Sequence, residues 1–137
     1  MTSWKLMAVI AAMVVLAGSV GTAWAGEPEV RLRTKLAGGA VGGLEPSGHA
    51  DFRARSGRAR LNVEVEDVNL AEGTALAVSV MVDGMKISVG TITVSAAPVR
   101  GGELELNTQD GQSVPAVKSG TTVIVEGPGG AILSGVL

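Results

Sequence analysis

The segment from His49 to Glu66 concentrates the residue types that could bind a charged ligand. Its sequence is HADFRARSGRARLNVEVE, with four arginines inside eight consecutive positions. If Ser56 and Gly57 form a two-residue turn, alternate residues of the two flanking strands share one face, because successive strand side chains point to opposite sides. The polar residues then gather on one face and the apolar residues on the other. The expected cross-strand pairs are Arg55–Arg58, Arg53–Arg60, Asp51–Asn62 and His49–Glu64.

The arginines of this hairpin would face like charges across the strands, which is destabilising unless something compensates. They are Arg53, Arg55, Arg58 and Arg60. Three explanations are open. The charges can keep an exposed strand edge from pairing with other chains, or they can form ion pairs with Glu103 and Glu105 of a neighbouring strand. They can also bind an anionic partner: a lipid phosphate, an acidic glycan or an acidic protein surface. Surface charges are usually solvated or paired internally, so the pattern favours the first two explanations over a binding site.

His49, Asp51 and Glu64 form the sharpest candidate for a metal site. One imidazole and two carboxylates suit a divalent transition metal. An ordinary polar pair between His49 and Glu64 explains the same residues more simply. A metal site also needs surrounding groups that orient its ligands, and an exposed hairpin end seldom supplies them. The pattern therefore favours the polar pair, and we expect no cofactor.

The composition argues against catalysis and against nucleic-acid binding. The chain has one histidine and no cysteine, and no serine lies in a G-x-S-x-G turn, so no nucleophile and base are arranged for acyl transfer. Phe52 is the only aromatic residue after position 25, which leaves no platforms on which sugars or bases could stack. Without Lys5, 10 Lys and Arg stand against 13 Asp and Glu, a net charge of −3. Nucleic-acid-binding domains are normally basic, so no nucleic-acid partner is expected.

The first 25 residues have the pattern of a cleaved signal peptide. Lys5 precedes the uncharged run LMAVIAAMVVLAG, and Ala23-Trp24-Ala25 has the A-x-A form of a cleavage site. The apolar run is shorter than the ~20 residues that a membrane-spanning helix needs. We therefore expect a signal peptide at residues 1–25 and a single domain at residues 26–137, with no transmembrane segment in the mature form. The destination would be the periplasm or the cell exterior.

The remainder of the chain alternates apolar and polar residues with period two, between Gly-rich turns, which is typical of an all-β protein. Asp83-Gly84 predicts a type I′ turn, with Val78 opposite Val89 farther along the hairpin. The change of phase after Gly90 predicts a bulge. Further strands are expected in the segments EVRLRTKL, GGELELNT and GTTVIVEG, and a last one at residues 132–137. About eight strands without a helix predict a single antiparallel β-sandwich, immunoglobulin-like in the loose architectural sense.

These features predict an exported, non-catalytic β-sandwich that acts as a binding or structural module. Its partner would be a protein or another component of the cell envelope. The alternative is an accessory protein that binds a metal through His49, Asp51 and Glu64, or an anion through the arginine hairpin. A small secreted hydrolase is the third possibility.

Overall fold

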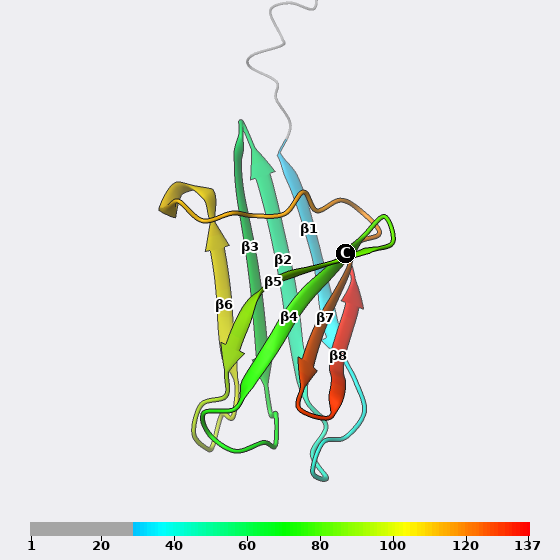
Figure 1. Ribbon diagram of the computed structural model, residues 1–137, viewed down its shortest axis with the longest axis vertical. Helices are drawn as coiled ribbons and strands as arrows, with labels where there is room; N and C mark the ends of the chain where they lie inside the picture. Colours follow the sequence, from blue (N-terminus) through cyan, green and yellow to red (C-terminus); the bar gives the residue numbers. More distant parts are fainter. Residues whose placement is uncertain (1–28) are drawn as a thin grey trace, which may run out of the picture.

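The computed structural model describes residues 29–137, which form eight β-strands and one short 3-10 helix, η1 (Figure 1). The predicted signal peptide lies outside the described residues. Within residues 29–137, no helix is long and apolar enough to cross a membrane. The elements are β1 (Val30–Ala37), β2 (Ser47–Arg55), β3 (Arg58–Glu66), β4 (Ala75–Val82), β5 (Met85–Thr93), β6 (Gly102–Asn107), η1 (Thr108–Asp110), β7 (Thr122–Gly127) and β8 (Gly130–Val136).

All eight strands belong to one antiparallel sheet with the order β5-β4-β7-β8-β1-β2-β3-β6. The sheet curls until its two edge strands, β5 and β6, approach each other at one end. There a Cβ added to Gly102 would lie 2.6 Å from Ile92 Cγ2, and the Ser95 amide donates to the Gly101 carbonyl at 2.8 Å. The result is a nearly closed, barrel-like sheet.

The prediction of an all-β, eight-stranded antiparallel protein is confirmed, whereas the expected division into two stacked sheets is wrong. Strands β8 and β1 join what would have been the two layers, through the single register pair Ala37–Ser134. Glycine permits this approach, because a Cβ at Gly135 would lie 2.3 Å from the Lys35 carbonyl oxygen. Period-two alternation gives every strand one buried face in a sandwich and in a barrel alike, so the sequence pattern could not distinguish them.

The junction between β8 and β1 divides the sheet into two groups of four strands. We call β1, β2, β3 and β6 the arginine half, and β5, β4, β7 and β8 the valine half. Valines supply much of the buried core of the valine half; Val78, Val80, Val123 and Val125 are all fully buried. In the arginine half the inward residues include Phe52, Leu61, Val63 and Val65, which are also buried.

The hairpin between β4 and β5 confirms the predicted turn. Asp83 and Gly84 both have positive φ, 52° and 82°, as a type I′ turn requires. Farther from the turn the register shifts, and Val78 pairs with Gly90. The irregularity at Gly90 is therefore confirmed, and the pairing of Val78 with Val89 is wrong because the bulge adds one residue to β5.

The hairpin between β2 and β3 has the register that the sequence predicts. Ser56 and Gly57 occupy the turn with φ of 50° and 78°. The four expected polar pairs lie opposite one another, from Arg55–Arg58 at the tip to His49–Glu64. The turn at Ser56-Gly57 thus determines which side chains face outward on both strands.

The end of the chain is a paired strand, as predicted. β8 pairs with β7 along its length, and Leu133 on β8 is only 1% exposed. Beyond β8, the Leu137 amide donates to the Thr121 carbonyl at 2.8 Å. The segment between β6 and β7, residues 108–121, crosses the upper part of the molecule (Figure 1) and buries Val117 against the core.

Candidate functional site

The outer surface of the arginine half carries rows of charged residues that run across the strands. Strand alternation directs these side chains away from the core, and the register aligns them. The row nearest the tip contains cations only, and acidic residues become more frequent toward the opposite end. In order from the tip, the rows are Arg55–Arg58, Arg31–Arg53–Arg60–Asn107, Arg33–Asp51–Asn62–Glu105 and Lys35–His49–Glu64–Glu103.

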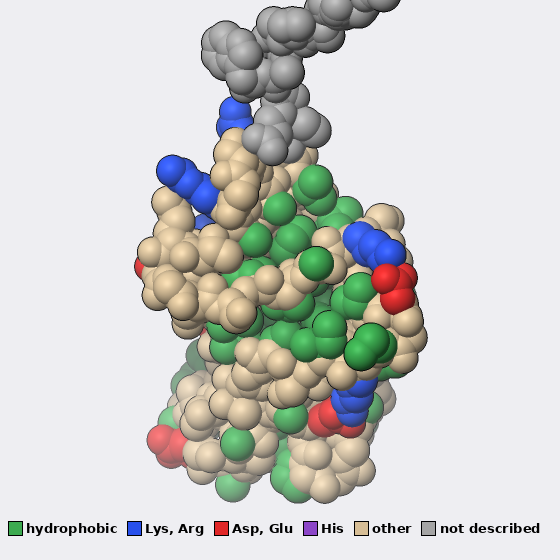
Figure 2. Space-filling model, turned by 45° about the horizontal axis from the view of Figure 1, so that its top comes forward, with side chains coloured by type: hydrophobic (Ala, Val, Ile, Leu, Met, Phe, Trp, Pro, Cys, Tyr) green, Lys and Arg blue, Asp and Glu red, His purple; other side chains and the backbone are tan. Residues whose placement is uncertain are grey.

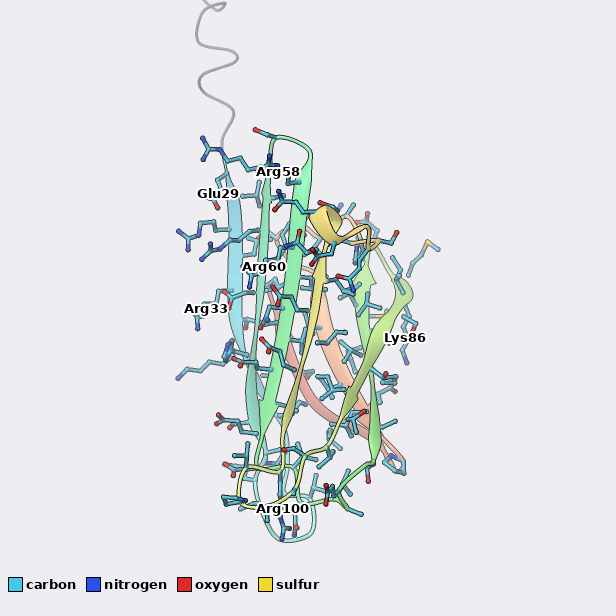
Figure 3. All side chains as sticks on the ribbon, turned by 90° about the vertical axis from the view of Figure 1, so that its left-hand side faces the viewer. Glu29, Arg33, Arg58, Arg60, Lys86 and Arg100 are labelled. Carbon is cyan, nitrogen blue, oxygen red and sulfur yellow. The ribbon has the colours of Figure 1, made fainter. Side chains whose placement is uncertain are left out.

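The first two rows form a cationic surface that we call the arginine face. It consists of Arg31, Arg53, Arg55, Arg58 and Arg60. Figure 3 shows Arg58 and Arg60 on this side of the molecule, with Arg33 farther from the tip. All five members of the arginine face are exposed.

Ion pairing compensates only part of this charge. Arg60 Nε lies 2.6 Å from Glu105 Oε2, which confirms the expected contribution of β6. The other expected partner, Glu103, instead accepts a hydrogen bond from the Asn62 amide at 2.5 Å. Among the described residues, no ion pair within 4.0 Å involves Arg53, Arg55 or Arg58.

These arginines line a shallow hollow of about 620 Å³ at the tip of the hairpin. Asn107, at the end of β6, and Gln109, within η1, add amide groups to it, and Glu29 precedes β1 at its margin. Guanidinium groups and side-chain amides all donate hydrogen bonds, and guanidinium pairs with phosphate or carboxylate through two parallel hydrogen bonds. The full lining is Glu29, Arg53, Ala54, Arg55, Ser56, Arg58, Ala59, Arg60, Asn107 and Gln109.

The structure brings His49, Asp51 and Glu64 together, as predicted. His49 Nε2 lies 2.8 Å from Glu64 Oε1 and 3.9 Å from Asp51 Oδ2. Asp51 also contacts Arg33, whose Nε is 3.6 Å from its Oδ1. Within residues 29–137, no cluster of three or more His, Asp or Glu residues has an arrangement that could hold a metal ion. The contacts match the polar pair that the sequence favours, and a metal at this place stays a prediction.

Sequence reasoning missed that Arg31 belongs to the arginine face, together with the amides of Asn107 and Gln109. The alternation of the first strand indicates that Arg31 points outward, but it does not reveal which strand lies beside it. The register pair Arg31–Arg53 supplies that information. Asn107 is likewise placed by its pairing with Arg60. Only the order of the strands assembles these residues into one surface.

No protein-family model, curated protein or solved structure matches this chain. The function is therefore inferred from the charge and the geometry of the arginine face.

Proposed function

We propose that this protein is an exported, non-catalytic module of the periplasm or cell exterior that works by contact, and that the arginine face binds an anionic partner. The observation that carries the proposal is the concentration of Arg53, Arg55 and Arg58 in one hollow, without a carboxylate in ion-pair contact among the described residues. Export is supported by the pattern of the first 25 residues.

The position of the hairpin weakens the explanation by edge protection. Charged side chains protect a sheet when they lie on an edge strand, where unpaired backbone groups would otherwise recruit another chain. Strands β2 and β3 are both interior, because β1 flanks β2 and β6 flanks β3. Most of this hairpin therefore has no free edge to protect.

Internal compensation also falls short. Arg53 faces Arg31 on one side and Arg60 on the other. Arg55 faces Arg58, again across the strands. Like charges in directly opposed positions are destabilising, and an anionic partner would relieve this repulsion on binding. Arginine suits that role better than lysine, because its planar group matches phosphate and carboxylate.

The test compares two double variants that remove the same amount of charge. Arg55→Thr/Arg58→Thr removes cations from the arginine face, whereas Lys86→Thr/Lys118→Thr removes two cations that pair with Glu126 and Asp83 elsewhere. We expect the parental protein to be retained on a sulfated-glycan column and on a phosphate-bearing resin at low salt. The arginine variant should elute at clearly lower salt, and the lysine variant close to the parental position.

Equal shifts for the two variants would mean that net charge alone governs retention, and the proposal would fail. The melting temperature of each variant is measured alongside, so that lost binding is not mistaken for unfolding. Thr suits a strand and relieves repulsion, so the arginine variant should melt at or above the parental temperature.

A further inference from the structure

The tip of the β2–β3 hairpin projects beyond the valine half. In Figure 1 the upper ends of β1, β2 and β3 extend past the turn between β4 and β5 and past the end of β8. The valine half therefore does not cover the inner surface of the hairpin at this end. This leaves a projecting element whose two surfaces differ in chemistry and whose inner surface is only partly covered.

The outer surface of this projection is the arginine face, and its inner surface is apolar. Val30 pairs with Ala54, and Ala54 pairs with Ala59, in one inward-facing row across the three strands. Val30 is 43% exposed although its position in the alternation is inward, and Ala54 and Ala59 are only partly buried. Figure 2, with the upper end turned forward, shows hydrophobic side chains gathered in the middle of this end and cationic side chains near its margin. The projection is thus amphipathic.

From this arrangement we infer that the hairpin tip docks on the surface of an anionic lipid bilayer. The inference rests on the proposed function and names the partner of the same arginine face. The arginines contact the headgroup phosphates, and the apolar row of Val30, Ala54 and Ala59 lies against the boundary between headgroups and acyl chains. Amphipathic helices that are cationic on one face and apolar on the other bind at this boundary, and the hairpin tip has the same division between its two faces.

The aromatic content argues against single-stranded nucleic acid as the anionic partner. Phe52 is the only aromatic side chain in residues 29–137, and it is 4% exposed. Nucleic-acid bases stack on exposed aromatic groups when single strands bind, and this surface offers none. Binding to an anionic bilayer depends on cations and on buried apolar area, and the hairpin tip offers both.

The distribution of charge along the arginine half also orients the molecule. Asp51, Glu64 and Glu103 lie in the rows behind the arginine face, away from the tip. The whole chain has a formal net charge of −2. A negatively charged surface therefore attracts the tip and repels the acidic end, so that the hairpin approaches first.

The experiment uses the protein in the form that the producing cell exports. It measures how much of this protein co-sediments with vesicles of phosphatidylglycerol and phosphatidylcholine. Vesicles of phosphatidylcholine alone are the neutral control. We expect binding to the anionic vesicles at low salt, a steep decrease at high salt, and little binding to the neutral ones. Since each basic residue near an anionic surface adds about 1 kcal/mol, Arg55→Thr/Arg58→Thr should weaken the partition constant about 30-fold. Lys86→Thr/Lys118→Thr should leave it within about twofold of the parental value.

A Val30→Ser variant tests the apolar row. It keeps every charge and should weaken binding to anionic vesicles a few-fold, with the largest effect at high salt. An unchanged partition constant would overturn the apolar contact, because charge alone would then account for the binding.

The remaining outcomes separate this inference from the proposed function. Retention on the sulfated-glycan column or the phosphate resin without vesicle binding would overturn the lipid inference and leave the proposed function standing. Complete release from the vesicles by millimolar inorganic phosphate, at constant ionic strength, would show that the arginine face takes free phosphate and not a bilayer. Absence of binding to vesicles, glycan and resin would overturn both proposals.

Discussion

The β2–β3 and β4–β5 hairpins both turn through two residues with positive φ, but they differ in the charge that their strands carry. The β4–β5 hairpin includes an edge strand, yet the outward side chains beside its turn are Met81 and Lys86. The β2–β3 hairpin has neighbours on both sides, yet it carries four arginines. Protection against edge pairing would predict the reverse. The comparison supports the proposal that the arginine half makes an external contact, whereas the buried valines of the other half belong to the core.

The largest expected effect comes from removing the last strand, which belongs to the valine half and closes it onto the arginine half. Deleting residues 132–137 removes the buried Leu133 and most of the pairing with β7. We expect the truncated protein to lose its cooperative thermal transition, which circular dichroism monitors. The control is Val136→Thr, which alters an outward side chain that is 59% exposed and should melt near the parental temperature. A cooperative, parental transition in the truncated protein would mean that the two halves do not depend on β8.

The junction itself can be broken with a single methyl group. Gly135→Ala places a Cβ 2.3 Å from the Lys35 carbonyl oxygen, so β8 must move away from β1. We expect the free energy of unfolding to fall by about 2–4 kcal/mol in urea titrations, as for a severe steric conflict. Gly129→Ala is the matched control, since a Cβ there has no neighbour within 4 Å. Equal stability of the two variants would show that the halves are held together without the close approach at Gly135.

The turn of the β4–β5 hairpin should give the next smaller loss of stability. Gly84 has φ of +82°, which a β-branched residue adopts only with strain of about 1–3 kcal/mol. Gly84→Val should therefore lower the free energy of unfolding by an amount in that range. Gly39→Val tests the same added bulk at a position with no neighbour within 4 Å of the Cβ. If both variants melt at the same temperature, the positive φ of Gly84 does not affect the stability of the protein as the turn geometry indicates.

The smallest effects distinguish paired from unpaired arginines within the arginine half. Arg60 is half exposed and bonds Glu105, so Arg60→Thr should cost at most about 0.5 kcal/mol of stability. Arg58→Thr removes the repulsion with Arg55 and should leave stability unchanged or raise it by a few tenths of a kcal/mol, roughly the size of one cross-strand pair. Melting curves at low and high salt should bring the two variants closer together as the salt rises. The opposite order of stability would contradict the assignment of Arg58 as uncompensated.

Local pattern predicted the hairpins well, because the residues that determine them are close in sequence. Ser56-Gly57 and Asp83-Gly84 supply the positive φ values that their turns need, and the register of β2 with β3 follows from the turn. Gly90 indicated the bulge because it lies in the strand where the bulge occurs. Each of these features is set within one pair of adjacent strands.

The arrangement of strands far apart in the sequence could not be predicted in the same way. Nothing in the alternation of β1 indicates that β8 will lie beside it, and this neighbour is what makes a barrel-like sheet instead of a sandwich. The arginine face was predicted only as far as the single hairpin extends. Arg31 and Asn107 belong to this surface because they pair with β2 and β3. The sequence offered ion pairs with Glu103 and Glu105 only as one of three explanations and did not indicate which arginine Glu105 would contact.

The adjacency of β1 and β8 also determines when this chain can finish folding. These are the first and the last strands of the described sequence, and they are neighbours in the sheet. The amino-terminal strand leaves the ribosome before the carboxy-terminal one, so the sheet cannot close until β8 has been synthesised. Contacts between distant segments also form slowly. A chain with this order of strands therefore stays unclosed until late in synthesis, and the proposed export through a secretory channel requires such an unclosed chain.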